Sequence, residues 1–427
     1  MIHSHRFRVN SLWLLILFTL PLPLLFAIYQ ELPSLYQGEK LGINAGLIAY
    51  TWMLAVIYLA TKPKWLDKRI GLPDMYLVHG MLSIFALLLA WLHKYLSPSA
   101  GWIKTSGDFS LYVFTGLIVY SLFFLGGWFT SRVKIAAFIK KSLEKIFKHE
   151  VSVWLHRLNI VATLVVYVHV WLIDYLRTLP LFFFLLTLYT ILTFASYAWY
   201  LLITNRSLMP GVIKEISFVA PTILEVVIKA PRSSLKQVQS GDFIFLSFPQ
   251  IQGLKEPHPF SVANDPRQAG SIKLLIETVG DYTQQLANVT SNTPVTFSKG
   301  YGVLHDMIKK TQPAQEIVLL GGGIGVVPFF SILSEFKEKT MYFFYSIKKE
   351  KEFLESELLE TWDQAQNRTL FLQKGRFTKD QLKEHVPLHE DAIYLIAGPM
   401  AMNLAYEAFL IDHGITKEQI YYESFSW

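Results

Sequence analysis

The sequence predicts a multidomain protein in which a bundle of six transmembrane helices precedes a β-barrel domain and an α/β domain. Of the 427 residues, 52% are hydrophobic and 15% are aromatic, which is too apolar for a wholly water-soluble protein. Long apolar runs fill the chain as far as residue 203. From residue 209 they give way to shorter segments with the periodicities of strands and helices, so a second, water-soluble part is expected.

Six apolar runs approach the roughly 20 residues that an α-helix needs to cross a bilayer. The first run follows Arg6 and Arg8, as in a signal peptide, but it lacks a small-residue cleavage site, so a retained helix is expected. The six runs cover residues 11–29, 43–60, 75–96, 109–130, 151–173 and 180–203.

The distribution of charge predicts the orientation of these helices. Residues 1–208 contain 18 Lys and Arg against 8 Asp and Glu, so the formal net charge of +6 arises in this part. Fourteen of the 18 basic residues fall in alternate connecting segments. By the positive-inside rule we expect an integral, multi-pass protein of the plasma membrane with both termini in the cytoplasm. The basic excess therefore indicates membrane topology, and no nucleic acid partner is expected.

The part after residue 209 divides into two domains. The stretch "GVIKEISFVAPTILEVVIKA" alternates like antiparallel strands, and Pro and Gly interrupt the segments that follow it. After about residue 315, the apolar runs "EIVLLG", "MYFFYS" and "AIYLIAG" alternate with helical segments, which is typical of a parallel sheet. The expected boundaries are 1–208 for the membrane domain, 209–312 for the β domain and 313–427 for the α/β domain.

Four histidines lie within the apolar runs as two pairs. His79 and His93 are fourteen residues apart, which on a helix leaves them about 40° out of phase and roughly 21 Å apart. His156 and His169 are thirteen residues apart, about 140° short of full turns, so either a local distortion between them or two haems rotated relative to each other is expected. The two runs have the same direction, so depth pairs His79 with His156 and His93 with His169.

Four imidazoles at two depths suit the axial ligation of two b-type haems. The alternative is that the histidines lie near helix ends and hydrogen-bond to backbone. A zinc or copper site is disfavoured because the ligands on each helix are too far apart to meet at one ion. The absence of cysteine excludes disulfides and iron–sulfur clusters.

The stretch "VLLGGGIGVVPFFSIL" predicts a strand, a glycine turn and the start of a helix. Gly321, Gly322, Gly323 and Gly325 would let the backbone approach the pyrophosphate of a dinucleotide, although close packing alone also explains glycines. Ser346 and Lys348 follow the next strand, and Arg376 follows in "KGRFT". These groups favour a ribose 2′-phosphate and hence NADPH over NADH, the alternative being solvated surface lysines.

Taken in order, the motifs "HPFSV", "VGDYT", "GGGIGVVPF", "YSIK", "IAGPMAM" and "YYESFSW" resemble those of the ferredoxin-NADP reductase type of dehydrogenase domain. Joined to helices with paired histidines, they resemble the NADPH oxidase and ferric reductase superfamily, including its prokaryotic flavocytochrome b members. The resemblance covers nearly the whole chain from the second apolar run onward.

The resemblance implies FAD in the β-barrel domain and NADPH in the Rossmann-like domain. Ser261 would lie near the reactive flavin ring, and Trp427 would cover that ring until the nicotinamide arrives. Two departures from the family pattern are Glu277, in place of a basic residue, which leaves FAD or FMN open, and Ala397, in place of a cysteine near the nicotinamide. The other residues that the resemblance assigns to the cofactors are His258, Pro259, Phe260, Val262, Gly280, Thr283, Gly398 and Pro399.

The implied activity is a transmembrane NADPH oxidase that carries electrons from cytoplasmic NADPH through FAD and two haems to dioxygen outside, forming superoxide. One alternative keeps this path and reduces a ferric or cupric chelate. Another is a haem-binding sensor or transporter with a regulatory nucleotide-binding module. Membrane lipids are expected partners, and no obligatory protein partner is expected because the sequence has no EF-hand pattern.

Overall fold

The computed structural model describes the whole chain except residues 1–14, 17, 125–154, 349–350, 352 and 423–427. The described residues fall into two compact units. A helical unit lies within Val9–Lys64 and Pro73–Ile203, and a β-rich unit combines Trp65–Leu72 with Thr204–Ser424.

Three helical stretches of the described part are long and apolar enough to cross a membrane: Ser34–Ala60, Asp74–Leu96 and Pro180–Leu202. α6 has 24 residues and two charged side chains, and α10 has 14 residues; the apolar runs 109–130 and 151–173 extend beyond the described residues. The six-helix arrangement therefore stays a prediction. The elements of the helical unit are α2 (Leu22–Glu31), η1 (Ser34–Glu39), α3 (Lys40–Ala60), α5 (Leu72–Leu96), α6 (Gly101–Phe124), α10 (Leu158–Trp171), α11 (Asp174–Arg177) and α12 (Pro180–Ser207). The short helix α4 (Lys64–Ile70) lies almost wholly in the segment that belongs to the β-rich unit.

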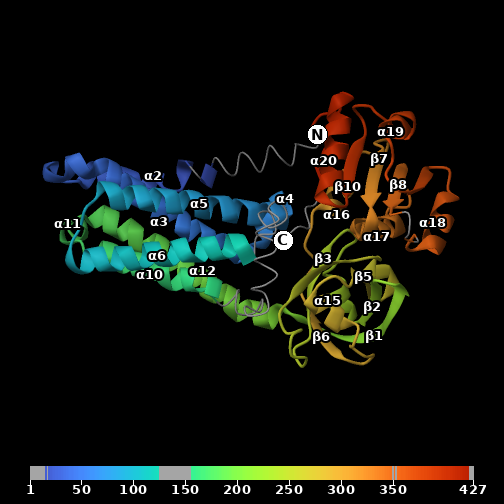
Figure 1. The fold of residues 1–427 in the computed structure, drawn as a ribbon, viewed down its shortest axis with the longest axis horizontal. Coiled ribbons are helices and arrows are strands. Elements are labelled where there is room, and N and C mark those ends of the chain that lie inside the picture. Colours follow the sequence, from blue (N-terminus) through green and yellow to red (C-terminus); the bar gives the residue numbers. More distant parts are fainter. Residues whose placement is uncertain (1–14, 17, 125–154, 349–350, 352, 423–427) are drawn as a thin grey trace. The chain divides into compact units, whose positions relative to one another are not determined.

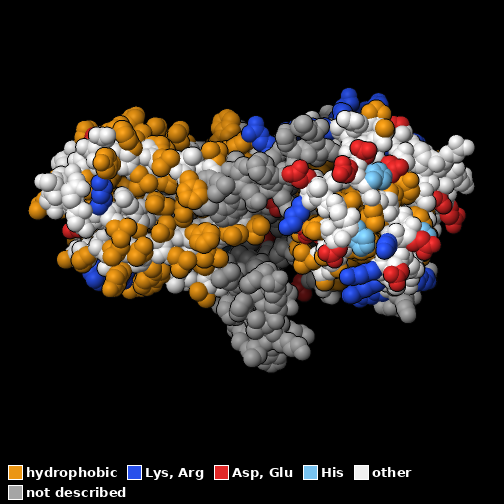
Figure 2. All heavy atoms as spheres, turned by 90° about the horizontal axis from the view of Figure 1, so that it is seen from above, with side chains coloured by type: hydrophobic (Ala, Val, Ile, Leu, Met, Phe, Trp, Pro, Cys, Tyr) orange, Lys and Arg blue, Asp and Glu red, His pale blue; other side chains and the backbone are white. Residues whose placement is uncertain are grey.

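The long helices of the helical unit lie lengthwise beside one another (Figure 1). Apolar side chains of α2, α3, α10 and α12 form a common core. Hydroxyl pairs join the helices inside it, since Tyr50 lies 2.8 Å from Thr190 and Tyr167 lies 2.9 Å from Thr187. On the face in Figure 2 the outer surface of this unit is mostly hydrophobic, as expected of helices that face lipid.

The first sheet of the β-rich unit has six antiparallel strands in the order β4-β3-β6-β1-β2-β5. A bridge between Val262 and Leu274 brings its two edges together, so the sheet curls into a barrel around a buried apolar core. The strands are β1 (Met209–Ala220), β2 (Ile223–Lys229), β3 (Phe243–Ser247), β4 (His258–Ser261), β5 (Ile272–Glu277) and β6 (Pro294–Phe297), with the short helices α13 (Arg232–Leu235), α14 (Pro266–Ala269), α15 (Asp281–Leu286) and α16 (Leu304–Lys309).

The second sheet is parallel, with the order β11-β10-β7-β8-β9, and apolar clusters cover both of its faces. The sequence patterns predicted β7, β8 and β10; the edge strands β9 and β11 were not predicted. The elements are β7 (Ile317–Gly322), η2 (Gly323–Val326), α17 (Val327–Glu335), β8 (Met341–Ile347), α18 (Ser356–Asp363), β9 (Arg368–Lys374), α19 (Lys379–His385), β10 (Ile393–Ala397), α20 (Met400–Asp412) and β11 (Ile420–Tyr422).

Candidate functional site

The structure brings the four histidines of the helical unit together in two facing pairs. The ring centroids of His79 and His156 are 6.0 Å apart, and those of His93 and His169 are 6.2 Å apart. Two imidazoles that bind one metal ion from opposite sides, with metal–nitrogen bonds of about 2 Å, have centroids roughly 6 Å apart. Each pair therefore has the spacing of a bis-histidine site. Among the described residues no cluster of three or more His, Asp or Glu could hold a bare metal ion.

Backbone carbonyls of neighbouring helices orient three of the four rings. The Nδ1 atoms of His79 and His93 on α5 lie 3.1 Å and 2.8 Å from the carbonyl oxygens of Val56 and Gly42 on α3. His169 Nδ1 lies 2.8 Å from the carbonyl oxygen of Ile103 on α6. A carbonyl oxygen only accepts, so in each ring Nδ1 carries the proton and Nε2 is left as a ligand.

Glycines let two of these rings lie against the adjacent helix. A Cβ atom at Gly46 on α3 would lie 2.8 Å from His93 Nδ1, and one at Gly107 on α6 would lie 3.1 Å from His169. Neither glycine was predicted from the sequence, since glycine is common in membrane helices and carries no local signal of this role.

A distortion between His156 and His169, expected from their spacing, is present. Arg157 forms a turn after His156, and α10 begins at Leu158. The amide of Ile160 bonds to the carbonyl of Arg157 at 3.0 Å, the tighter pattern of a helix start. The two histidines are therefore not on one regular helix, and their angular mismatch does not prevent both from facing α5.

In the barrel, the motifs "HPFSV" and "VGDYT" lie side by side. The ring of His258 on β4 stacks on Tyr282 of α15 with centroids 3.6 Å apart, and the Tyr282 hydroxyl donates to the carbonyl of Leu246 at 3.0 Å. Burial raises the pKa of Tyr282, which keeps the phenol neutral at ordinary pH. Tyr282, which was not among the predicted site residues, thus joins the two motifs.

The residues predicted to contact flavin differ in accessibility. His258, Pro259, Phe260 and Ser261 form β4 and are all half-buried, so their side chains are partly open to a ligand. Val262 is 0% exposed and belongs to the barrel core. The strand alternation turns its side chain inward, so the prediction that Val262 lies along the cofactor rests on its backbone.

α15 begins directly after Gly280, as predicted. The Thr283 hydroxyl accepts from the Gly280 amide at 3.0 Å and caps this end of the helix. The space beside Gly280 is open, since a Cβ atom there would meet nothing within 4 Å. The Thr283 side chain thus supports the turn, while the amides of the first helical turn remain the groups suited to a phosphate.

Most glycines of the predicted dinucleotide turn are required by packing. A Cβ atom at Gly325 would lie 2.6 Å from the Gly398 Cα, and one at Gly322 would lie 2.3 Å from the Met402 sulfur. A Cβ atom at Gly321 would lie 2.4 Å from Val326 Cγ1. Only Gly323, with φ of +57° and open space around it, has the left-handed backbone that favours glycine at this turn.

These packing contacts join two loops of the parallel sheet. Gly398 and Pro399 follow β10, with Pro399 exposed and Ala397 buried at the strand end beside Gly321. The loops that follow β7 and β10 are thus in close backbone contact. The glycines that allow this contact are the same glycines that were predicted to let a dinucleotide approach the backbone.

Ser346 lies at the end of β8, and Arg376 follows the adjacent strand β9. The Ser346 hydroxyl donates to the carbonyl of Gly321 at 3.2 Å and is buried, whereas Lys348 and Arg376 are exposed. Tyr406 of α20 belongs to the same group: burial raises the pKa of Tyr406, opposed by its hydrogen bond with Ser346 and the charge of Arg376. Tyr406 was not predicted, because it lies 60 residues beyond Ser346 in the sequence.

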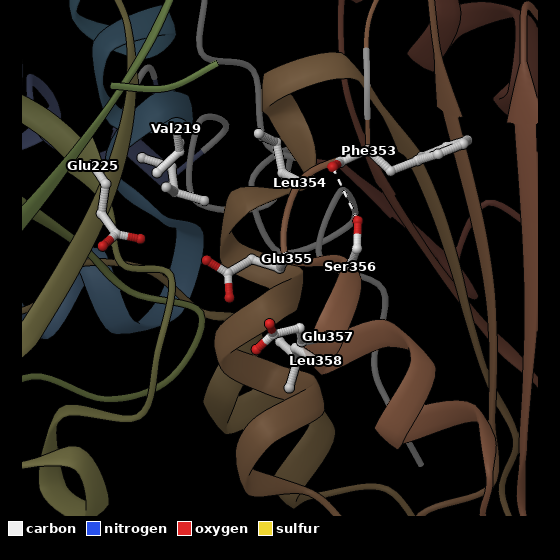
Figure 3. Close-up of a pocket in the computed structure, with 9 residues that line it drawn as sticks. Val219, Glu225, Phe353, Leu354, Glu355, Ser356, Glu357 and Leu358 are labelled. Atoms are coloured by element: carbon white, nitrogen blue, oxygen red, sulfur yellow. Dashed lines mark hydrogen bonds between the residues drawn. The ribbon is translucent and has the colours of Figure 1, made fainter. Parts of the chain in front are cut away.

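Glu277 has a basic partner, although not the one that the family pattern supplies. Its carboxylate accepts from Lys351 at 2.6 Å, and Lys273 on the same strand bonds to Glu355 at 2.9 Å. Glu225 and Glu355, the two carboxylates paired with Lys273, line a pocket of about 370 Å³. Figure 3 shows Glu225 and Glu355 on either side of it. None of the predicted coenzyme residues lines this pocket, and Trp427 lies outside the described residues.

Two domain families match the β-rich unit: the FAD-binding domain over residues 211–325 and the oxidoreductase NAD-binding domain over residues 319–407. Among solved structures, a ferredoxin NADP+ reductase from Neisseria gonorrhoeae with bound FAD and NADP covers 51% of this chain and 98% of its own, with 18% identity and a TM-score of 0.44.

The curated relatives include oxidases from plants and animals. Respiratory burst oxidase homolog protein E of Arabidopsis thaliana is 30% identical over 29% of this chain and 15% of its own length. Human NADPH oxidase 5 is 26% identical over 28% of this chain and 20% of its own length. The matches thus span a fifth or less of those relatives. Together with the FAD- and NAD-binding domains, these matches show that the chain is similar to NADPH oxidases and contains the cofactor-binding module of an NAD(P)H oxidoreductase.

Proposed function

We propose that the protein is a transmembrane NADPH oxidase that carries electrons from cytoplasmic NADPH, through FAD and two b-type haems, to dioxygen on the other side of the membrane. The observation that carries the proposal is the presence of two histidine pairs, 6.0 Å and 6.2 Å between centroids, in apolar helices of a chain that also has the FAD- and NAD-binding module. A flavin accepts a hydride and releases single electrons, and haem iron carries one electron at a time.

The histidine pairs fit the axial sites of haem. His79 and His93 are separated by about 21 Å along α5, which would put one site near each surface of a bilayer about 30 Å thick. The Nδ1 hydrogen bonds hold the rings against rotation, and the apolar helix faces exclude water from the iron.

In the β-rich unit, the half-buried residues of β4 would line the flavin, with Ser261 nearest the reactive ring. The first-turn amides of α15 would hold its pyrophosphate. Ser346, Lys348, Arg376 and Tyr406 would recognise the 2′-phosphate of NADPH, because a guanidinium and an ammonium favour the extra phosphate that NADH lacks. Trp427 is proposed to cover the flavin.

Anaerobic addition of NADPH to the purified, FAD-supplemented protein tests the proposal. We expect flavin and haem absorbance to change together, and superoxide dismutase-sensitive superoxide to form when air is admitted. Haems that stay oxidised while the flavin is reduced would contradict the electron path. Slow reoxidation by air with fast reoxidation by a ferric chelate would replace dioxygen with a metal chelate as the acceptor.

A further inference from the structure

The four histidines differ in the group that accepts from Nδ1. The closest partner of Nδ1 in His79, His93 and His169 is a backbone carbonyl of a neighbouring helix. The Ser106 hydroxyl also lies 3.4 Å from His169 Nδ1, farther than the carbonyl of Ile103 at 2.8 Å. His156 instead faces the hydroxyl of Ser121 on α6, with 3.1 Å between His156 Nδ1 and Ser121 Oγ. The pair formed by His93 and His169 thus has two carbonyl partners, while the pair formed by His79 and His156 has one carbonyl and one side-chain hydroxyl.

We propose that Ser121 is a positioning residue that fixes the orientation of His156 and tunes the reduction potential of the haem held by His79 and His156. The proposal rests on the proposed function, because it assumes that His156 binds haem iron. It assigns to Ser121 no contact with substrate or with the reacting atoms.

The surroundings of His156 make Ser121 the acceptor. Asn159 also approaches Nδ1, but through its amide nitrogen at 3.5 Å, and that amide donates to the carbonyl of His156 at 2.9 Å. An amide nitrogen cannot accept the Nδ1 proton. In the described part of the chain, the Ser121 oxygen is therefore the acceptor placed to keep the proton on Nδ1 and leave Nε2 for iron.

The difference between a carbonyl and a hydroxyl has two physical consequences. A helix carbonyl is fixed by the backbone, whereas a serine hydroxyl rotates and also seeks an acceptor for its own proton. An Nδ1 hydrogen bond increases electron donation by the imidazole, which favours ferric iron and lowers the potential. Loss of the Ser121 bond should therefore raise the potential of one haem.

Among the described glycines, none has a Cβ position within 4 Å of His156, in contrast to the other pair. The rings of His93 and His169 lie against Gly46 and Gly107, where a Cβ would come within 2.8 Å and 3.1 Å of them. His156 precedes the turn at Arg157, outside the regular part of α10. Among the described residues, the orientation of this ring consequently depends more on its hydrogen bond with Ser121.

The ring planes provide a way to tell the two haems apart. The planes of His79 and His156 are 46° apart, and those of His93 and His169 are 89° apart. The electron paramagnetic resonance of low-spin ferric haem depends on the angle between the axial imidazole planes, so two distinct signals are expected.

The test compares Ser121→Ala, Ser121→Thr and the matched control Ser110→Ala in the full-length protein by redox titration and by low-spin ferric resonance. Ser110 lies on the same helix and also bonds to the α10 region, since its hydroxyl donates to the carbonyl of Ala162 at 3.0 Å, but it contacts no histidine ring. Ser110→Ala thus removes a hydrogen bond between α6 and α10 without changing the partner of His156 Nδ1.

With Ser121→Ala we expect a positive shift in the midpoint potential of one haem and a changed resonance for the 46° pair only. Retention of haem at that site should weaken by roughly 10-fold or more, as for other lost partners of metal ligands. Ser121→Thr should restore both properties, and Ser110→Ala should leave both potentials unchanged.

Unchanged potentials and signals in Ser121→Ala, equal shifts in Ser110→Ala, or failure of threonine to restore the wild-type values would each overturn the role of Ser121. A wild-type protein without two low-spin haems would instead refute the proposed function itself, so the two failures are distinguishable.

Discussion

The helical and β-rich units build their candidate sites in different ways. In the helical unit, four widely spaced histidines are held mainly by backbone carbonyls of other helices. In the β-rich unit, short contiguous motifs are held by close packing, as where Gly325 meets Gly398 or His258 stacks on Tyr282.

This difference follows from the solvent of each unit. Inside a membrane every polar group needs an internal partner, so an imidazole and a helix carbonyl satisfy each other. In a parallel sheet that faces water, the loops at the carboxyl ends of the strands bind the ligand, and the geometry of their turns determines which ligand fits. Changes in the two units should therefore fail differently: loss of a metal site in one, and loss of loop packing or coenzyme preference in the other.

The largest effect is expected from His169→Ala. Loss of an axial ligand should remove one of the two haems and lower superoxide formation by more than the roughly 10- to 100-fold typical of a lost outer-shell partner. Reduction of the flavin by NADPH should persist, because the β-rich unit is untouched. The measurements are the haem-to-flavin ratio and dye reduction by NADPH. His413→Ala is the control, since His413 Nδ1 also bonds to a carbonyl, that of Phe409 at 2.8 Å, but pairs with no histidine; equal loss in both variants would contradict the assignment.

The next effect concerns loop packing. Gly325→Ala places a Cβ 2.6 Å from the Gly398 backbone, so the two loops must separate, at a cost of about 1–3 kcal/mol. Thermal unfolding of the coenzyme-free protein should shift down by roughly 2–4 °C per kcal/mol. Gly280→Ala, where the new Cβ meets nothing within 4 Å, should leave the unfolding temperature near that of the wild type. Equal shifts in the two variants would show that the loop contact is not tight.

Coenzyme preference should respond to Arg376→Ala. Removing a charged hydrogen bond worth about 1.5–3 kcal/mol should lower kcat/KM for NADPH by roughly 10- to 100-fold and leave that for NADH nearly unchanged. Steady-state rates with the two coenzymes measure the ratio. Lys383→Ala on α19, which replaces another exposed cation, is the control. A parallel loss with both coenzymes would place Arg376 away from the 2′-phosphate.

The smallest effect is a pH dependence within the β-rich unit. Burial alone would lower the pKa of His305, but its bond to Glu335, 3.1 Å from Nε2 to the carboxylate, raises the pKa above 6.5. Burial opposes ionisation of Glu335 as well, yet bonds from His305 and Arg267 lower its pKa to about 2. Asp306 also faces His305, at 3.4 Å from Nδ1.

The signs of these shifts define a pH window. A raised histidine pKa gives stability that is complete below about 6.5 and is lost as pH rises through the folded value. A lowered carboxyl pKa gives stability that is present above about 4.5 and is lost as pH falls toward 2. The unit should therefore unfold at a higher temperature near pH 6 than at about pH 8.5. Glu335→Gln should reduce this difference; an unchanged difference would contradict the pairing.

The sequence predicted the elements whose signal is local. β7, η2 and the start of α17 follow from the apolar run and the glycines, and α15 follows from "GDYT". The pairing of His79 with His156 and of His93 with His169 followed from helix geometry and direction. The edge strand β11 has only three residues and gives too short a pattern to recognise.

Residues that act through tertiary contacts were not predictable. Tyr282, Tyr406, Gly46 and Ser121 take their roles from partners between 24 and 60 residues away, and no local pattern marks them. The inward side chain of Val262 was not predictable either, because a motif does not reveal which face of its strand is buried.

The most direct test of the central claim is electron transfer across a sealed membrane. The protein is placed in vesicles with FAD, NADPH is supplied only on the side where the β-rich unit is exposed, and a membrane-impermeant superoxide probe is enclosed on the other side. We predict that the enclosed probe is reduced in the wild type, that superoxide dismutase inside the vesicle suppresses the signal, and that His169→Ala abolishes it. Superoxide formed only on the NADPH side would contradict the account.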